Sequence, residues 1–543
     1  MKNIAKYAMI LAATVALTSC NDWLTEDTPG VTKRGDYITS AETATEVVNA
    51  AYVPLMWEYG NSTTYYSEWF IGDIVSDDAL KGGQNLSDMA DAYDMENFKT
   101  NTNNKLLLGF FRAQWQGVQR ANLAIESVNG LALDDSFTQE LKDRLIAEAT
   151  FLRAMYYFRL VRVYGGMPLI DYVVESSAQW NQERATRDAT LQFIIRDLEA
   201  CVEVLPLKSK YPIDDMGRAT RGAAQAMLLK ANLYRAGFLA QEGGDATAAY
   251  REAKKWGEEI MSTNEYDLVP NYFDQFLLAG ENGKESVFEI QYTEDGRSDY
   301  GEGEGFTLGT FVVIMQRPRT TLFSQEGWGF DRPSWNLYNE YEEGDPRRDA
   351  TILNPTEQQI EDAGGNVINY QGNYLHNRKY AMYTDGTTVT MPYYNLTHHT
   401  RGPINNKVIR YSDVLLMYAE ACVELGDLPA AKLALNRVRS RVGLPAFPYS
   451  ATIQGATVTY GDNANDLRAA VRHERRVELA MEGHRWFDLL RWGIAKQTMD
   501  AYFAQEAPEV RAEAAAFQVG KHELMPIPSD EILLSGISQN PGY

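Results

Sequence analysis

The chain has 543 residues, of which 45% are apolar and 23% charged, and its net charge is −23. This balance is typical of a globular protein with a large core and excludes collagen-like and disordered chains. Because so acidic a chain is repelled by phosphate backbones, we expect no nucleic-acid partner; neutral sugars, cations and uncharged or basic peptides remain open.

The N-terminus has the pattern of an export signal. Two lysines precede a short apolar run that ends at Leu17, and about 20 apolar residues would be needed to span a bilayer. The sequence LTSC, ending at Cys20, resembles a bacterial lipobox. We therefore predict a signal peptide over 1–19, lipidation of Cys20 and a tether over 20–40. The alternative is an ordinary signal peptide with a chance cysteine.

Helical periodicity dominates the body of the chain. Apolar residues from Ala147 to Val161 recur at 4-3-4-3 spacing before Gly165 and Pro168 end the pattern. Similar patterns predict further helices near 41–58, 118–130, 187–204, 219–240, 246–262, 408–425, 428–441 and 465–492. The fold class is therefore predicted to be mostly α-helical, with helix pairs packed like tetratricopeptide repeats over about 41–262 and 408–492. No clean 34-residue period accompanies them.

The composition changes between about 265 and 405. Gly, Asn, Asp, Pro and Tyr are frequent there, and one short strand is predicted over Ser286–Tyr292. A loop region of this length is usually functional. We interpret it as a ligand-facing insertion, with minor β structure, in a single domain over 41–543.

Two more segments are predicted to be structural. Pro526, Pro528 and Pro541 indicate an extended C-terminal tail over 524–543 that packs on the helical body. Charged residues at i,i+3 and i,i+4 spacing along 465–492 indicate a network that joins helix to helix.

Four ordered segments carry a family resemblance. They are GDIVSDDA at 72–79, AEATFLRAMYYF with VYGGMPL within 147–169, ERRVELAMEGHRWFDL at 474–489, and LMPIP with QNPGY within 524–543. With the lipobox, these segments resemble the SusD/RagB family of Bacteroidetes outer-membrane lipoproteins. The resemblance covers nearly the whole mature chain and is weakest across 295–400.

The resemblance implies a specific function. Such proteins are helical lipoproteins on the cell surface, anchored in the outer membrane, that cap a SusC-like TonB-dependent transporter. They pass glycans to it, or peptides in the RagB branch, and are not catalytic. We therefore expect a glycan-binding lipoprotein with no cofactor, and a peptide-binding one is the alternative.

Other classes of function have weaker support. With 74 acidic residues, nearby carboxylate pairs are unavoidable and do not indicate a glycoside hydrolase. A purely structural helical scaffold also remains open. The zinc motif HExxH fails because its second histidine would fall at Val477, and the adjacent pair His398 and His399 seldom chelates alone. No metal ligand is therefore assigned, and the acidic turn of Asp73, Asp77 and Asp78 remains open between binding a cation or sugar hydroxyls and capping the backbone.

Aromatic loops are the candidate ligand surface. A sugar ring presents a C–H face to flat aromatic side chains and hydroxyls to polar groups, and Gly327 and Gly329 leave Trp328 unshielded. The alternatives are that these aromatics pin loops to the body and that the aspartates cap turns. The predicted ligand-binding residues are Tyr65, Tyr66, Trp69, Asp73, Asp77, Trp328, Arg332 and Trp335.

Overall fold

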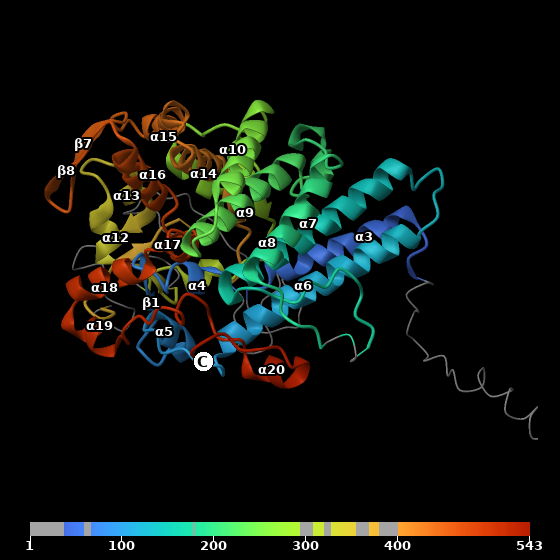
Figure 1. Cartoon of the computed structure of the whole chain (residues 1–543), viewed down its shortest axis with the longest axis horizontal. Helices are drawn as coiled ribbons and strands as arrows, with labels where there is room; N and C mark the ends of the chain where they lie inside the picture. Colours follow the sequence, from blue (N-terminus) through green and yellow to red (C-terminus); the bar gives the residue numbers. More distant parts are fainter. Residues whose placement is uncertain are drawn as a thin grey trace, which may run out of the picture.

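The computed structural model describes residues 37–58, 67–176, 179, 181–293, 308–319, 327–354, 369–379 and 400–543, with side chains except at 509–511. Figure 1 shows a row of long helices crossing the molecule, with short strands and small helices gathered at one end. The predicted Cys20, Tyr65 and Tyr66 lie outside the described residues.

Long helices form the body of the protein. They are α3 (Ala41–Tyr52), α6 (Lys105–Gly130), α7 (Gln139–Tyr164), α8 (Arg187–Val202), α9 (Arg221–Gln241), α10 (Thr247–Ser262), α14 (Tyr411–Glu424), α15 (Leu428–Arg441), α16 (Ala464–Glu478) and α18 (Ala495–Gln505). Shorter helices are α4 (Trp69–Gly72), α5 (Ala90–Glu96), α11 (Val312–Met315), α12 (Trp335–Glu340), α13 (Pro346–Thr351), α17 (Arg485–Arg491), α19 (Pro508–Glu513) and α20 (Ser529–Ser535).

The strands pair in four small antiparallel sheets. They are β1 (Ala79–Gly82) with β3 (Phe330–Pro333), β2 (Ser286–Ile290) with β6 (Asn406–Arg410), β4 (Ile352–Leu353) with β5 (His376–Asn377), and β7 (Tyr449–Ile453) with β8 (Ala456–Tyr460). Only β2 was predicted from sequence. The β7–β8 hairpin was missed.

Successive helices pack as neighbours along the row. Each of α6 to α10 packs against the next, and α14 joins α10 to α15 and α16 (Figure 1). Close packing of α6 on α7 depends on Gly117, because a Cβ there would lie 2.4 Å from the ring of Tyr156. One apolar core extends from Ala44 to Ile537. The predicted mostly helical fold class, with paired helices and minor β structure, is confirmed.

The single helix predicted over 465–492 is wrong. The chain leaves α16 after Glu478, makes a turn in which Met481 and Gly483 have φ of 62° and 76°, and re-enters a helix at Arg485. Positive φ is costly for a residue with a side chain, so this turn must be held by contacts from elsewhere. Those contacts come from residues 72–78, described below.

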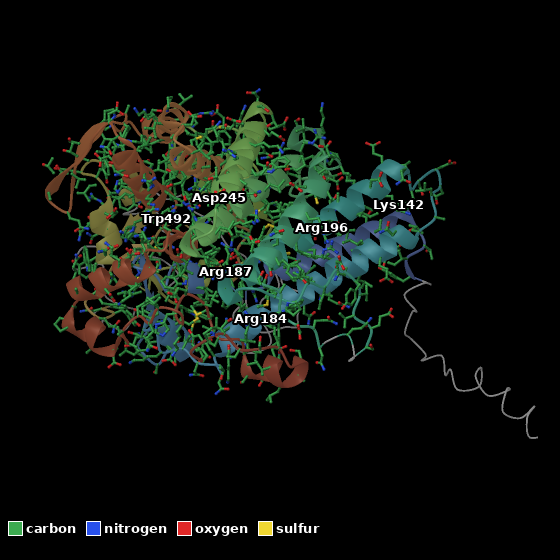
Figure 2. The ribbon with its side chains drawn as sticks, viewed as in Figure 1. Lys142, Arg184, Arg187, Arg196, Asp245 and Trp492 are labelled. Carbon is green, nitrogen blue, oxygen red and sulfur yellow. The ribbon has the colours of Figure 1, made fainter. Side chains whose placement is uncertain are left out.

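The C-terminal tail packs on the body but is not wholly extended. Helix α20 interrupts it, while Asn540 donates hydrogen bonds from Nδ2 to the carbonyls of Tyr164 (3.0 Å) and Met525 (2.7 Å). Arg184, labelled in Figure 2, donates to the carbonyl of Ser538 and to Oδ1 of Asn540. The tail therefore closes over the end of α7.

Within the described residues, no helix is both long and apolar enough to cross a bilayer.

Candidate functional site

Two of the signature segments lock together in the interior. Both carboxylate oxygens of Asp73 accept the backbone N–H of Gly483, at 3.0 and 2.9 Å. Asp77 receives two hydrogen bonds from Arg485, at 2.8 and 2.9 Å, and Asp78 receives one from Nε of Arg476 at 2.8 Å. The aspartates of 72–79 therefore hold the turn between α16 and α17.

Burial and neighbouring charges have opposite effects on the pKa of Asp77 and the same effect on the pKa of Asp73. Burial raises the pKa of Asp77, but the guanidinium groups of Arg476 and Arg485 outweigh it and bring the pKa to about 2. Burial raises the pKa of Asp73 well above its usual value, and the nearby carboxyl of Asp331 adds to the rise. Asp77 is thus a charged partner in an ion pair, whereas the environment of Asp73 favours its neutral form.

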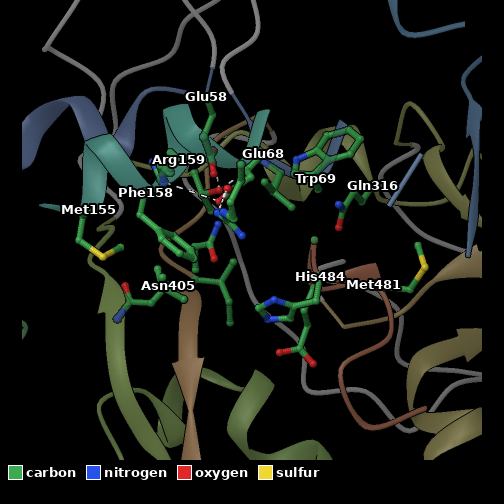
Figure 3. A pocket seen from close by; sticks show the side chains of 18 of the residues that line it. Glu58, Glu68, Trp69, Met155, Phe158, Arg159, Gln316, Asn405, Met481 and His484 are labelled. Atoms are coloured by element: carbon green, nitrogen blue, oxygen red, sulfur yellow. Dashed lines mark hydrogen bonds and ion pairs between the residues drawn. The ribbon is translucent and has the colours of Figure 1, made fainter. Parts of the chain in front are cut away.

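A cavity lined by both charged and apolar side chains lies beside this turn. It has a volume of ≈ 60 Å³ and is lined by residues from α4, α7, α9, β6, the segment 310–316 and the turn 481–484. Figure 3 shows Trp69, His484 and Arg159 around its centre, with Glu58 and Glu68 above. Two of the four signature segments, those within 147–169 and 474–489, contribute lining residues to this cavity.

The charged groups of the cavity differ in how closely they contact an oppositely charged side chain. Glu68 forms an ion pair with Arg162 and lies 3.6 Å from Nε of Arg159. Lys230 donates to Asp413 at 3.1 Å. Burial lowers the pKa of His484 well below its usual value, and the charge of Lys230 lowers it further, so the imidazole is neutral at pH 7.

A network of buried ion pairs supports the other side of the turn. Arg410 donates to Glu482 (2.7 Å), Glu285 (2.9 Å) and Glu478 (3.0 Å), and Arg347 and Arg441 also contact Glu478. The charged network predicted for this region is present, and its partners come from distant helices and strands.

Three predicted ligand residues are buried and engaged within the protein. Asp73 and Asp77 hold the turn described above, and Arg332 is fully buried, donating to the carbonyls of Gly329 (3.2 Å) and Asn373 (2.8 Å). Burial lowers the pKa of Arg332 to about 9. These side chains are therefore withdrawn from the surface on which they were expected, because each satisfies backbone or charged groups inside.

The predicted tryptophans lie in two different places. Trp69 is 6% exposed and lines the cavity. Half-buried Trp328 packs edge-to-face on Phe311, 5.2 Å between ring centroids, and donates its backbone N–H to Ile314. Trp328 is not among the described residues that line the cavity, but it packs on the segment 311–316, of which Val312 and Gln316 do line it.

Trp335 belongs to a separate aromatic cluster at the surface. Its ring lies edge-to-face with Tyr338 (5.4 Å) and Tyr374 (5.2 Å), all three side chains being partly exposed. Ser334 caps α12 by accepting from Leu337 and donates to the carbonyl of Asp77, which fixes Trp335 relative to the locked turn. The sequence did not predict Tyr338 as part of this cluster. Tyr338 is brought next to Trp335 by α12, which is too short to show helical periodicity in the sequence.

Two family models match successive parts of the chain. The model described as "SusD family" matches residues 284–543, and the one described as "Starch-binding associating with outer membrane" matches residues 22–233. The chain belongs to the SusD family. SusD family proteins are non-catalytic glycan-binding proteins associated with the outer membrane. The predicted family and the predicted non-catalytic binding class are confirmed.

Solved and curated relatives of this SusD family protein cover most of it. A laminarin-binding SusD-like protein is 28% identical, with a TM-score of 0.74, and the match covers 93% of this chain and 100% of that one. A surface glycan-binding protein A from Bacteroides thetaiotaomicron, solved in complex with laminarihexaose, is 25% identical over 92% of this chain and 100% of that one, with a TM-score of 0.73. A SusD-like protein from Bacteroides ovatus is 26% identical over 91% of this chain and 83% of its own length.

Proposed function

We propose that this protein captures an oligosaccharide or polysaccharide at the cell surface and delivers it to a SusC-like TonB-dependent transporter. The observation that carries the proposal is the match, over nearly all of both chains, to a protein that binds laminarin. A second relative was solved with laminarihexaose bound, so a β-glucan is the first ligand to test.

The cluster of Trp335, Tyr338 and Tyr374 is the proposed glycan platform, with Trp328 and the tyrosines at 65 and 66 as further contacts. Aromatic faces at a partly exposed surface suit the C–H face of a sugar ring. Polar groups lie beside the rings: the guanidinium of Arg348 is 4.9 Å from the Tyr338 ring, and Asn336 is next to Trp335 in the chain. Beneath this surface, the buried side chains of Asp73, Asp77 and Arg332 stabilise the segments that carry the rings.

Truncating one ring tests the platform. Stacking of a nucleic-acid base on an aromatic ring contributes about 1–3 kcal/mol, and we apply this range to a sugar ring. A loss of about 1.4 kcal/mol lowers the affinity tenfold. Trp335→Ala, and separately Trp328→Ala, should weaken laminari-oligosaccharide binding about tenfold in calorimetric titration. Tyr172→Ala is the control, because Tyr172 is a partly exposed aromatic of another loop.

A panel of ligands separates glycan from peptide. Titrations with β-glucan, α-glucan and mixed peptides should give binding to at least one glycan. Binding to peptides alone would replace the glycan proposal with its peptide alternative. Reducing-sugar release from any bound glycan would contradict a purely binding role.

Lipid anchoring at Cys20 is part of the same proposal, and its support is the LTSC sequence after a short apolar run. One acyl chain binds a membrane only marginally, so stable anchoring requires more than one. Cys20→Ala should release the protein from the membrane fraction or leave it unprocessed. Unchanged membrane retention of this variant would contradict the anchor.

A further inference from the structure

The cavity beside the locked turn is lined by donors that have no acceptor. Nε1 of Trp69, Nε of Arg159 and Nδ1 of His484 are buried and make no hydrogen bond to any described residue. Their side chains are 6%, 7% and 6% exposed. Because buried polar groups are nearly always hydrogen-bonded, three such groups on one small cavity point to a ligand that accepts hydrogen bonds.

The acids of the cavity are already used. Glu482 receives hydrogen bonds from Arg410 and Lys379, and Glu58 accepts from Oγ1 of Thr310 and the N–H of Phe311. Glu68 forms its close ion pair with Arg162. Of the lining cations, Arg159 is therefore the one with no hydrogen-bonded acid among the described residues, so the bound group should be negatively charged.

The size of the cavity limits what can enter. A water molecule needs about 10–15 Å³ of such space, so ≈ 60 Å³ accommodates about four or five non-hydrogen atoms. A carboxylate with its neighbouring carbon, or a sulfate group, has this size. A whole hexose has about twelve non-hydrogen atoms, more than twice as many, and does not fit.

We propose that this cavity is a binding site for a small oxyanion, held by the indole N–H of Trp69, the guanidinium of Arg159 and the imidazole of His484. Figure 3 shows these three side chains on different sides of the cavity centre. A planar guanidinium can donate two parallel hydrogen bonds to the oxygens of a carboxylate or sulfate. Neutral His484 donates from Nδ1 in the tautomer that carries its proton there.

The oxyanion has two possible sources: a free anion, or the acidic group of a charged sugar whose ring stays outside the cavity. The proposal does not depend on which glycan the surface platform binds. It adds a second, charge-selective site to the protein. If the oxyanion belongs to a charged sugar, this site extends the ligands of the protein from neutral to acidic glycans.

Titration calorimetry at low salt tests the site with three probes: sodium acetate, sodium glucuronate and methyl glucoside. We expect acetate or glucuronate to bind and methyl glucoside not to bind. Tighter binding of glucuronate than of acetate assigns the site to acidic sugars, and the reverse order assigns it to free anions. Absence of binding by both anions would overturn the proposal.

Three variants locate the binding. Arg159→Met should weaken the anion at least tenfold, and Trp69→Phe, which keeps the ring and loses the N–H, should weaken it several-fold. The control is Arg196→Met, since Arg196 is exposed on α8 (Figure 2) and does not line the cavity. Unchanged anion affinity in both cavity variants would overturn the assignment.

Thermal unfolding without ligand distinguishes a binding role from a structural one. Glu68 lies 3.6 Å from Arg159 but keeps its closer ion pair with Arg162 when Arg159 is removed, so Arg159→Met should change the melting temperature little. A large loss of stability would mean that Arg159 serves the fold through Glu68 and would contradict the proposal. Laminari-oligosaccharide titration of the same variant should be unchanged, so failure here is separable from failure of the glycan platform.

Discussion

Replacing Asp77 by Asn tests whether the GDIVSDDA segment serves the fold rather than the ligand. Asp77 is 2% exposed and forms ion pairs with Arg485 and Arg476. The two guanidinium groups lower its pKa from 3.8 to about 2 in spite of burial. At 1.36 kcal/mol per unit, that shift corresponds to about 2.5 kcal/mol, close to the 3–5 kcal/mol typical of a broken buried pair.

We therefore expect Asp77→Asn to lower the free energy of unfolding by about 2–3 kcal/mol at pH 7, measured by urea titration. Because the folded pKa is below the unfolded one, this stabilisation is complete above pH 3.8 and is lost as pH falls through 2. Asp500→Asn is the matched control, since it breaks an exposed pair with Lys496 and should cost under about 0.5 kcal/mol. Lost glycan affinity with unchanged stability would refute the structural role.

Three further changes probe the same architecture. Gly72→Ala places a Cβ 2.2 Å from the carbonyl oxygen of Gly483 and should cost about 1–3 kcal/mol in urea unfolding, whereas Gly130→Ala meets nothing within 4 Å and should be neutral; equal costs would contradict the close contact. Burial lowers the pKa of His473, but its hydrogen bond to Glu340 and the carboxylate of Glu342, 3.4 Å from its Nε2, outweigh this and raise the pKa to about 9. Its stabilisation is thus complete below pH 6.5 and lost as pH rises through 9, and the difference in unfolding free energy from His473→Gln should shrink over that interval; a constant difference would show the pairing to be ineffective. Deleting residues 539–543 removes the hydrogen bonds of Asn540 and should lower the melting temperature while glycan affinity is kept; lost affinity with an unchanged melting temperature would place the tail at the ligand.

Long periodic helices could be predicted from the sequence because their signal is local. The spacing from Ala147 to Val161 predicts the helix and Gly165 predicts its end, and the structure ends α7 at Tyr164, where Gly165 donates to the carbonyl of Val161. The break after Glu478 has no such signal. Its residues continue a helical pattern, and the positive φ of Gly483 is stabilised by Asp73, 410 residues earlier.

The candidate site was harder to predict because charged residues usually lie at the surface, and here several of them are buried. Asp77 and Arg332 look like surface groups in the sequence, and only their partners in space show that they are interior. His484 stands in the signature segment 474–489 and Arg159 within 147–169, but neither residue was predicted to bind a ligand. Each becomes notable only when a cavity and the lack of an acceptor are seen together.

The lock between residues 72–79 and 476–485 also sets the order in which the protein can fold. Asp73, Asp77 and Asp78 find their donors only in the last seventh of the chain, and until then three carboxylates have no partners to accompany them into the interior. Contacts so distant in sequence form late and slowly. A chain synthesised from its N-terminus therefore cannot complete this part of its core until residue 485 has been made. A fragment that stops earlier leaves the acidic turn at 72–79 without its partners.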